Sequence, residues 1–214
     1  MSVWAGLKEI RFQGAGLRRF LSFTFACLFA VFTALARGQQ VDLMVGGNSL
    51  FSSKPTSASL AYPPPAEKGG MYPSGSIQFH FKNNFGFNVE TAFRYDKGLY
   101  NGFQRYRPAL YDANALYSRE IGAKTSADLM AGVGGERVLF YNEFATCNPA
   151  FGNCPTFVSS THFLAHLGAG ARYYVWRNFF VRPEVHYYYV MNNREFHSNN
   201  LFRAGVSIGY SFGR

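Results

Sequence analysis

Residues 76–94, SIQFHFKNNFGFNVETAFR, decide the fold of this chain. From Ser76 to Lys82, apolar residues alternate with polar ones. Successive side chains of a β-strand point to opposite faces, so this pattern predicts a strand with one apolar and one polar face. The pair Asn83-Asn84 predicts a two-residue hairpin turn, and the alternation resumes over 85–94. The stretch therefore predicts an antiparallel β-hairpin.

The same alternation recurs along the rest of the chain, and no helical periodicity is found after residue 40. Pro183 falls on the apolar face of one of these segments. Because proline lacks the N–H group that a ladder needs, it predicts a bulge or bend there. In all, eight strands are expected, over 40–50, 74–82, 85–95, 109–118, 126–138, 162–173, 179–190 and 201–212.

The connections between these strands alternate in length. Outer-membrane barrels join their strands by short periplasmic turns at one end and longer extracellular loops at the other. With both termini on the periplasmic side, this rule fits every connection of the chain. The long connections lie near 51–73, 96–108, 139–161 and 191–200, and the short ones near 83–84, 119–125 and 174–178.

Composition indicates which face of the sheet is outside. Aromatic residues make up 18% of the chain and charged residues only 15%. An eight-stranded barrel has room inside for modest side chains only, so the aromatic face must point to lipid and the charged face to the lumen. Buried charges are costly unless they are paired, so an ion-paired, non-conducting lumen is expected. The predicted lumen charges are Lys82, Glu90, Arg94, Asp112, Asp128, Glu136, Arg172, Arg182, Glu184 and Arg203.

The N-terminal segment has the three parts of a secretory signal peptide. Basic residues precede an uncharged stretch over 20–36, which ends in Ala34-Leu35-Ala36. A transmembrane anchor is the alternative, but the stretch is short for a span and is diluted by Ser and Thr. We expect cleavage after Ala36, with Gly38 as the alternative position. This leaves a signal peptide over 1–36 and a barrel domain over 37–214.

Several motifs resemble the OmpA/OmpX-like family of eight-stranded outer-membrane barrels. The Gly-rich segments 131–135 and 168–170 belong to this resemblance, and so does the sequence RAGVSIGY over 203–210. The latter has the form of the signal that the barrel assembly machinery reads during insertion. The resemblance implies an all-β, up-and-down transmembrane β-barrel in the bacterial outer membrane, a monomer in contact with outer-membrane lipid. The assembly signal would comprise Gly205, Ile208, Tyr210 and Phe212; family members usually end on an aromatic residue, whereas Gly213-Arg214 end this chain.

Other function classes are less well supported by the sequence. The formal charge of +9 is scattered, without the basic runs that nucleic-acid binding favours. Some barrel enzymes that deacylate lipid use a His-x-Ser pair, but His197 and Ser198 are adjacent and would point to opposite faces of a strand. His166, His186 and Glu184 could share a metal ion, although polar packing of the lumen is the simpler interpretation. We therefore expect a non-enzymatic barrel with a structural or surface-interaction role, and no catalytic residue, metal or cofactor. A narrow solute pore and a lipid-modifying enzyme are the alternatives.

Cys147 and Cys154 are predicted to form a disulfide within the long connection 139–161. The segment around them is rich in Asn, Pro and Gly, and an exported protein meets an oxidising compartment. Closing so short a ring stabilises the chain by roughly 2–3 kcal/mol, so the barrel itself should not depend on it. Replacing both residues by Ser should leave folding intact and speed proteolysis of this loop. Thiol labelling of both cysteines in the unreduced mature protein would contradict the pairing.

Overall fold

The computed structural model describes residues 40–53, 67, 69–81, 84–102, 104–141, 157–196 and 198–213, and this part of the chain is all-β. Among these residues no helix is long and apolar enough to cross a membrane. Every strand pairs antiparallel with its neighbours. The strands are β1 (Gln40–Ser52), β2 (Met71–His80), β3 (Phe85–Phe93), β4 (Gly98–Tyr100), β5 (Gln104–Gly122), β6 (Thr125–Tyr141), β7 (Phe157–Trp176), β8 (Phe179–Val190) and β9 (Asn200–Phe212).

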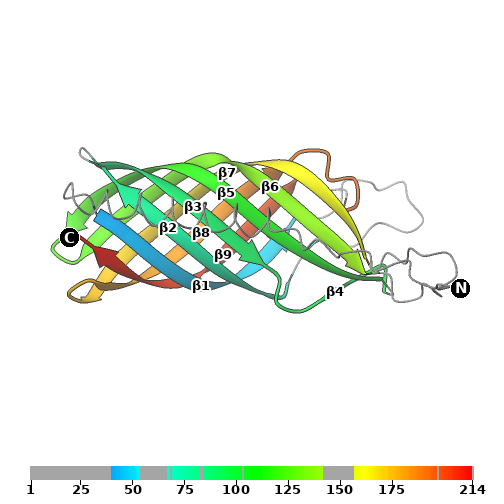
Figure 1. The fold of residues 1–214 in the computed structure, drawn as a ribbon, viewed down its shortest axis with the longest axis horizontal. Coiled ribbons are helices and arrows are strands. Elements are labelled where there is room, and N and C mark those ends of the chain that lie inside the picture. Colours follow the sequence, from blue (N-terminus) through cyan, green and yellow to red (C-terminus); the bar gives the residue numbers. More distant parts are fainter. Residues whose placement is uncertain are drawn as a thin grey trace, which may run out of the picture.

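The sheet closes into a barrel of eight strands. Its order is β3-β2-β1-β9-β8-β7-β6-β5, and the ring is completed where β3 pairs with β5. The remaining strand, β4, pairs only with the first residues of β5 and stands outside the ring. Figure 1 shows the tilted strands wrapping around a common axis. Closure leaves no unpaired strand edge in the ring, which is the condition for a sheet to span hydrocarbon.

The two ends of the barrel differ in the length of their connections. Val41 of β1 pairs with Phe212 of β9, so the start of the barrel and its last strand meet at one end, on the left in Figure 1. The tight turns at 123–124 and 177–178 lie at the same end, and the strand ends that border the longer connections lie at the other. This arrangement confirms that short and long connections alternate along the chain, as expected from the sequence. We call the end with the longer connections the outer end.

The eight predicted strands are confirmed, but three of them are longer than expected by four residues or more. β5, β6 and β7 extend beyond their predicted ranges, and their pairing continues to Arg105–Tyr141 and Tyr141–Phe157. Here the alternation of apolar and polar residues is weak, because strands that rise beyond the lipid need no apolar outer face. The short strand β4 was not expected from the sequence at all.

The bulge expected at Pro183 is not found. Gly170 pairs with Glu184 and Tyr173 with Val181, so the register between β7 and β8 is the same on both sides of the proline. Between these two pairs, the ladder of β7 and β8 is interrupted at Pro183 and Arg182. The interruption accommodates the proline, which has no N–H to donate, without an extra residue in the strand. The register shift in this pair lies between Tyr174 and Trp176, next to the turn.

The outer face of the barrel is apolar. Side chains that the alternation assigned to lipid, such as Val133, Leu167, Val185 and Ile208, are half or more exposed, whereas their neighbours in sequence point inward. In water such a surface would be unstable, and in a bilayer it is solvated by acyl chains. The predicted signal peptide over 1–36 and the predicted Cys147–Cys154 disulfide lie outside the described residues.

Candidate functional site

Charged side chains gather in the half of the lumen away from the outer end. We call this group the ionic core. It draws on every strand of the ring, since the inward positions of each strand bring one to three members to the axis. Its acidic and guanidinium members are at most 5% exposed. The ionic core comprises Asp42, His80, Glu90, Asp112, Asp128, His166, Arg172, Arg182, Glu184, His186 and Arg203.

Arg172 of β7 organises the end of the ionic core near the tight turns. Its Nη1 lies 2.5 Å from Asp42 Oδ2, and its Nη2 lies 2.8 Å from Asp128 Oδ1. The Nη2 group also donates to Ser118 Oγ. His80 Nε2 approaches the same Asp42 oxygen at 2.9 Å. One guanidinium thus neutralises two carboxylates that come from opposite parts of the chain.

Arg182 connects this group to the middle of the lumen. Its Nε and Nη2 donate to Glu184 Oε2 at 2.9 and 2.5 Å. It also lies 3.9 Å from both Asp128 and Glu90. Glu90 in turn accepts a hydrogen bond from Arg203 Nη2, so the ion pairs form one continuous network along the axis.

Glycines on β7 make room for these long side chains. A Cβ atom on Gly170 would lie 3.2 Å from Cγ and Cδ of Arg182. A Cβ atom on Gly168 would lie 3.1 Å from both His166 Nε2 and His186 Nδ1. The Gly-Ala-Gly segment therefore serves packing inside a narrow barrel, because the glycines lie directly under the arginine and the histidine pair.

A layer of apolar side chains closes the lumen above the ionic core. The sequence predicted an ion-paired lumen and gave no indication of this apolar layer. Each residue of the layer has no exposed surface, so no water-sized space adjoins its side chains. We call this layer the apolar seal; it consists of Leu50, Tyr72, Leu110, Leu164, Tyr188, Val190 and Leu201.

Beyond the apolar seal, the outer mouth holds a second, smaller polar group. Arg94 Nη1 donates to Tyr106 Oη at 3.0 Å, and the Tyr106 ring packs on Phe196. Glu67 and Glu136 are both fully buried here. Burial raises the pKa of the Glu67 carboxyl well above its usual range, and the neighbouring Glu136 carboxylate adds to the shift.

The predicted lumen charges can now be placed. Arg94 is half-buried at the outer mouth, Glu136 lies beside Glu67 in the same group, and Lys82 is outside the described residues. The sequence reasoning missed Asp42, although Leu43 and Val45 alternate with it and marked its face as inward. The predicted charges that point into the ionic core are Glu90, Asp112, Asp128, Arg172, Arg182, Glu184 and Arg203.

The residues of the predicted assembly signal lie on β9, where it pairs with β1. Ile208 and Phe212 point outward, and the half-buried Tyr210 ring packs edge-on against Phe179 and Phe212 at 4.8 and 4.7 Å. Gly205 instead faces Asn48, and a Cβ atom on it would overlap with Asn48 Oδ1. The signal residues are therefore divided between the lipid face and the barrel interior.

His197 and Ser198 are the residues that were considered for lipid hydrolysis. His197 lies outside the described residues. Ser198 is 3% exposed, and its Oγ shares a 2.8 Å hydrogen bond with Ser53 Oγ. That contact ties the connection after β8 to the end of β1.

Comparisons with known proteins agree with the fold. No protein-family model matches the chain, and no curated protein matches it. Among solved structures, the N-terminal β-barrel domain of Pseudomonas aeruginosa OprF is 17% identical, with 81% of this chain and 97% of that chain covered and a TM-score of 0.54. Neisserial surface protein A is 18% identical, with coverages of 83% and 97% and a TM-score of 0.52. A major outer membrane protein from Thermus thermophilus is 11% identical, with coverages of 80% and 99% and a TM-score of 0.53. The fold is thus that of the eight-stranded outer-membrane barrels.

Proposed function

We propose that this chain is a non-enzymatic outer-membrane barrel that holds its outer connections at the cell surface and passes no solute through its lumen. The observation that carries the proposal is the filled lumen. The ionic core and the apolar seal lie one above the other, and each leaves its side chains almost without exposed surface. With its lumen filled in this way, the barrel serves as a rigid support for surface contacts.

A solute pore requires a continuous polar path, and the described lumen offers none. In the half of the lumen away from the outer end, ions would meet carboxylates and guanidinium groups of the ionic core that are already paired with each other. Above them, the apolar seal would have to part before any hydrated ion could pass. Both barriers would have to rearrange at once, which favours the surface role over the pore.

A surface role also fits the unequal ends of the barrel. The short strand β4 and the described part of the connection after β8 meet at the outer end, where Tyr100 Oη donates to the Glu195 carbonyl at 2.7 Å. Tyr100 also packs on Phe140 and Phe196 at 5.4 and 5.6 Å. These contacts join β4, the end of β6 and the connection after β8 into one platform above the membrane, which is the kind of surface that a partner could contact.

Conductance of the purified barrel in planar lipid bilayers tests this function. We expect no steady channels at any applied voltage that the bilayer tolerates, because both the ionic core and the apolar seal exclude water. An open porin reconstituted in the same way serves as the positive control. Large, long-lived conductance steps from the heat-modifiable, folded protein would contradict the proposal and favour the pore.

A further inference from the structure

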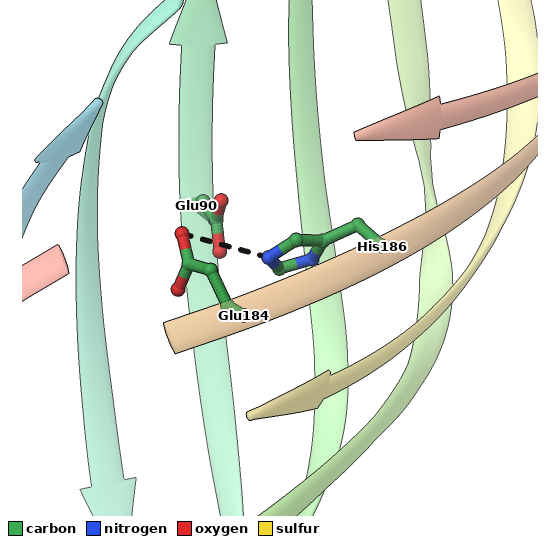
Figure 2. Close-up of side chains that lie close together, drawn as sticks. All are labelled: Glu90, Glu184 and His186. Carbon is green, nitrogen blue, oxygen red and sulfur yellow. Dashed lines mark ion pairs between the residues drawn. The ribbon is translucent and has the colours of Figure 1, made fainter. Parts of the chain in front are cut away.

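We propose that the barrel holds a divalent transition-metal ion, of the zinc class, between Glu90 of β3 and Glu184 and His186 of β8. Figure 2 shows the Glu90 side chain facing the other two across the barrel interior. One ligand atom from each residue lies within 4.8 Å of the other two. All three side chains are at most 4% exposed. We call these three residues the lumen triad.

Each atom that faces the others in the lumen triad has a lone pair that no hydrogen bond uses, and Glu90 Oε2 lies 3.9 Å from Arg182 Nη2, beyond hydrogen-bond distance. Glu90 gives one oxygen to Arg203 and leaves Oε2 without a hydrogen-bond partner. Glu184 gives Oε2 to Arg182 and keeps a free lone pair on Oε1, which accepts one hydrogen bond from Ser207. His186 Nε2 has no hydrogen-bond partner and lies 3.6 Å from Glu184 Oε1, which is too long for a hydrogen bond.

A chain of hydrogen bonds determines which nitrogen of His186 carries its proton. Asn114 Nδ2 donates to Asn88 Oδ1 at 2.9 Å, so Asn114 Oδ1 is the acceptor for His166 Nδ1 at 2.6 Å. In a neutral ring His166 Nε2 is then an acceptor, and His186 Nδ1 donates to it at 2.9 Å. The lone pair of His186 therefore sits on Nε2 and points at carboxylate oxygens.

This arrangement leaves three electron-rich atoms facing one another in a buried space, and a cation between them would resolve the repulsion. The charge of the ionic core supports the same conclusion. Its five carboxylates face three guanidinium groups, which leaves two negative charges when the histidines are neutral. A buried excess of this kind is costly, and one divalent cation balances it.

The donor set selects the class of metal. One imidazole nitrogen and two carboxylate oxygens are common zinc ligands, held at about 2.0–2.2 Å, and small side-chain rotations would bring the triad to that distance. The hydrogen bond from His186 Nδ1 to His166 is the outer contact that typically orients a metal-bound histidine. The sequence suggested His166 as a ligand, but its Nε2 is occupied by His186, and Glu90 takes that place.

Because the apolar seal closes the lumen, the ion should enter while the barrel folds and exchange slowly afterwards. The test is therefore to refold the denatured full chain into detergent with zinc chloride, to remove loose zinc with EDTA, and to measure bound metal by mass spectrometry. We expect close to one zinc ion per folded chain, and a higher midpoint temperature for loss of the compact gel band than in protein refolded with EDTA.

Two variants of the lumen triad and one control variant separate this site from other histidine contacts. His186→Gln should lose the bound zinc and the thermal shift, and so should Glu90→Gln. His80→Gln, which alters the His80–Asp42 pair near the tight turns, should keep both. Folded wild-type protein that retains no zinc would overturn the proposal, and so would equal retention by wild type and His186→Gln. If the wild-type protein retains no zinc, a proton shared by His166 and His186 would compensate the negative charge of the carboxylates instead.

Discussion

Deleting residues 210–214 should remove the protein from the outer membrane. Tyr210 pairs with both Leu43 of β1 and Phe179 of β8, and Phe212 pairs with Val41. Without these pairs, β1 loses its partner at the end of the barrel near the tight turns, and backbone groups would face hydrocarbon unsatisfied. The Tyr210 and Phe212 rings would also no longer anchor β9 at the membrane interface. We expect the heat-modifiable barrel to be almost absent from outer-membrane fractions and the chain to be degraded in the periplasm.

The shorter deletion of Gly213 and Arg214 is the matched control. The strand ends at Phe212, and Gly213 already has a positive φ of 77° that turns the chain away from the sheet. This variant should reach normal levels, so a chain end on the aromatic Phe212 is compatible with insertion. If the longer deletion also gives normal amounts of heat-modifiable barrel, then the closing role of β9 and its proposed recognition by the assembly machinery are both wrong.

Arg172→Met should strongly destabilise the barrel. Met keeps much of the volume but removes the charge that lies between Asp42 and Asp128. Asp42 then keeps only His80 as a partner, and Asp128 keeps only Arg182 at 3.9 Å. Removing one partner of a buried ion pair typically costs about 3–5 kcal/mol. The measurement is the midpoint temperature at which the compact gel band is lost, which should fall sharply.

Two further variants make this prediction specific. Arg119→Met changes an arginine on the exposed face of β5, and it should leave the midpoint nearly unchanged because an exposed charge contributes little. Adding Asp128→Asn to Arg172→Met should recover part of the loss, since one uncompensated carboxylate disappears. Equal midpoints for Arg172→Met and Arg119→Met would mean that the ion pairs of the core do not hold the barrel together.

The alternation of residue types was sufficient to assign the faces of most strands. In β8, Arg182, Glu184 and His186 alternate with apolar neighbours, and the structure buries these three while their neighbours stay exposed or half-buried. A shift by one residue would move every charge of the strand into lipid, so the pattern determines the face strongly. This reasoning works best where one face must meet acyl chains.

Contacts across the lumen could not be read from the same pattern. Arg172 and Asp42 are 130 residues apart in sequence, and the pairing depends on how far each strand is staggered around the ring. The apolar seal was missed for the same reason. An inward Leu50 or Leu164 is unremarkable on its own strand, and only the stagger brings such residues to one level.

The lumen triad shows the same limit at finer scale. Glu184 and His186 are two residues apart on one strand, so their shared face was evident from the sequence. Glu90 lies on β3, on the opposite side of the ring, and nothing local links it to β8. Hydrogen bonds such as that between His166 and Asn114 cannot be predicted from the sequence pattern. The pattern gives the face on which a side chain lies, whereas a hydrogen bond depends on the positions of individual atoms.

Access of water to the lumen tests the central claim most directly. Ser207→Cys introduces a thiol into the ionic core, where Ser207 is 2% exposed, in a chain whose native cysteines are replaced by Ser. Arg194→Cys places a thiol on the exposed connection after β8 as the control. A charged, membrane-impermeant thiol reagent should label the control at once and the lumen thiol only after the barrel is unfolded. Equally rapid labelling of both thiols in the folded, heat-modifiable protein would contradict a sealed lumen.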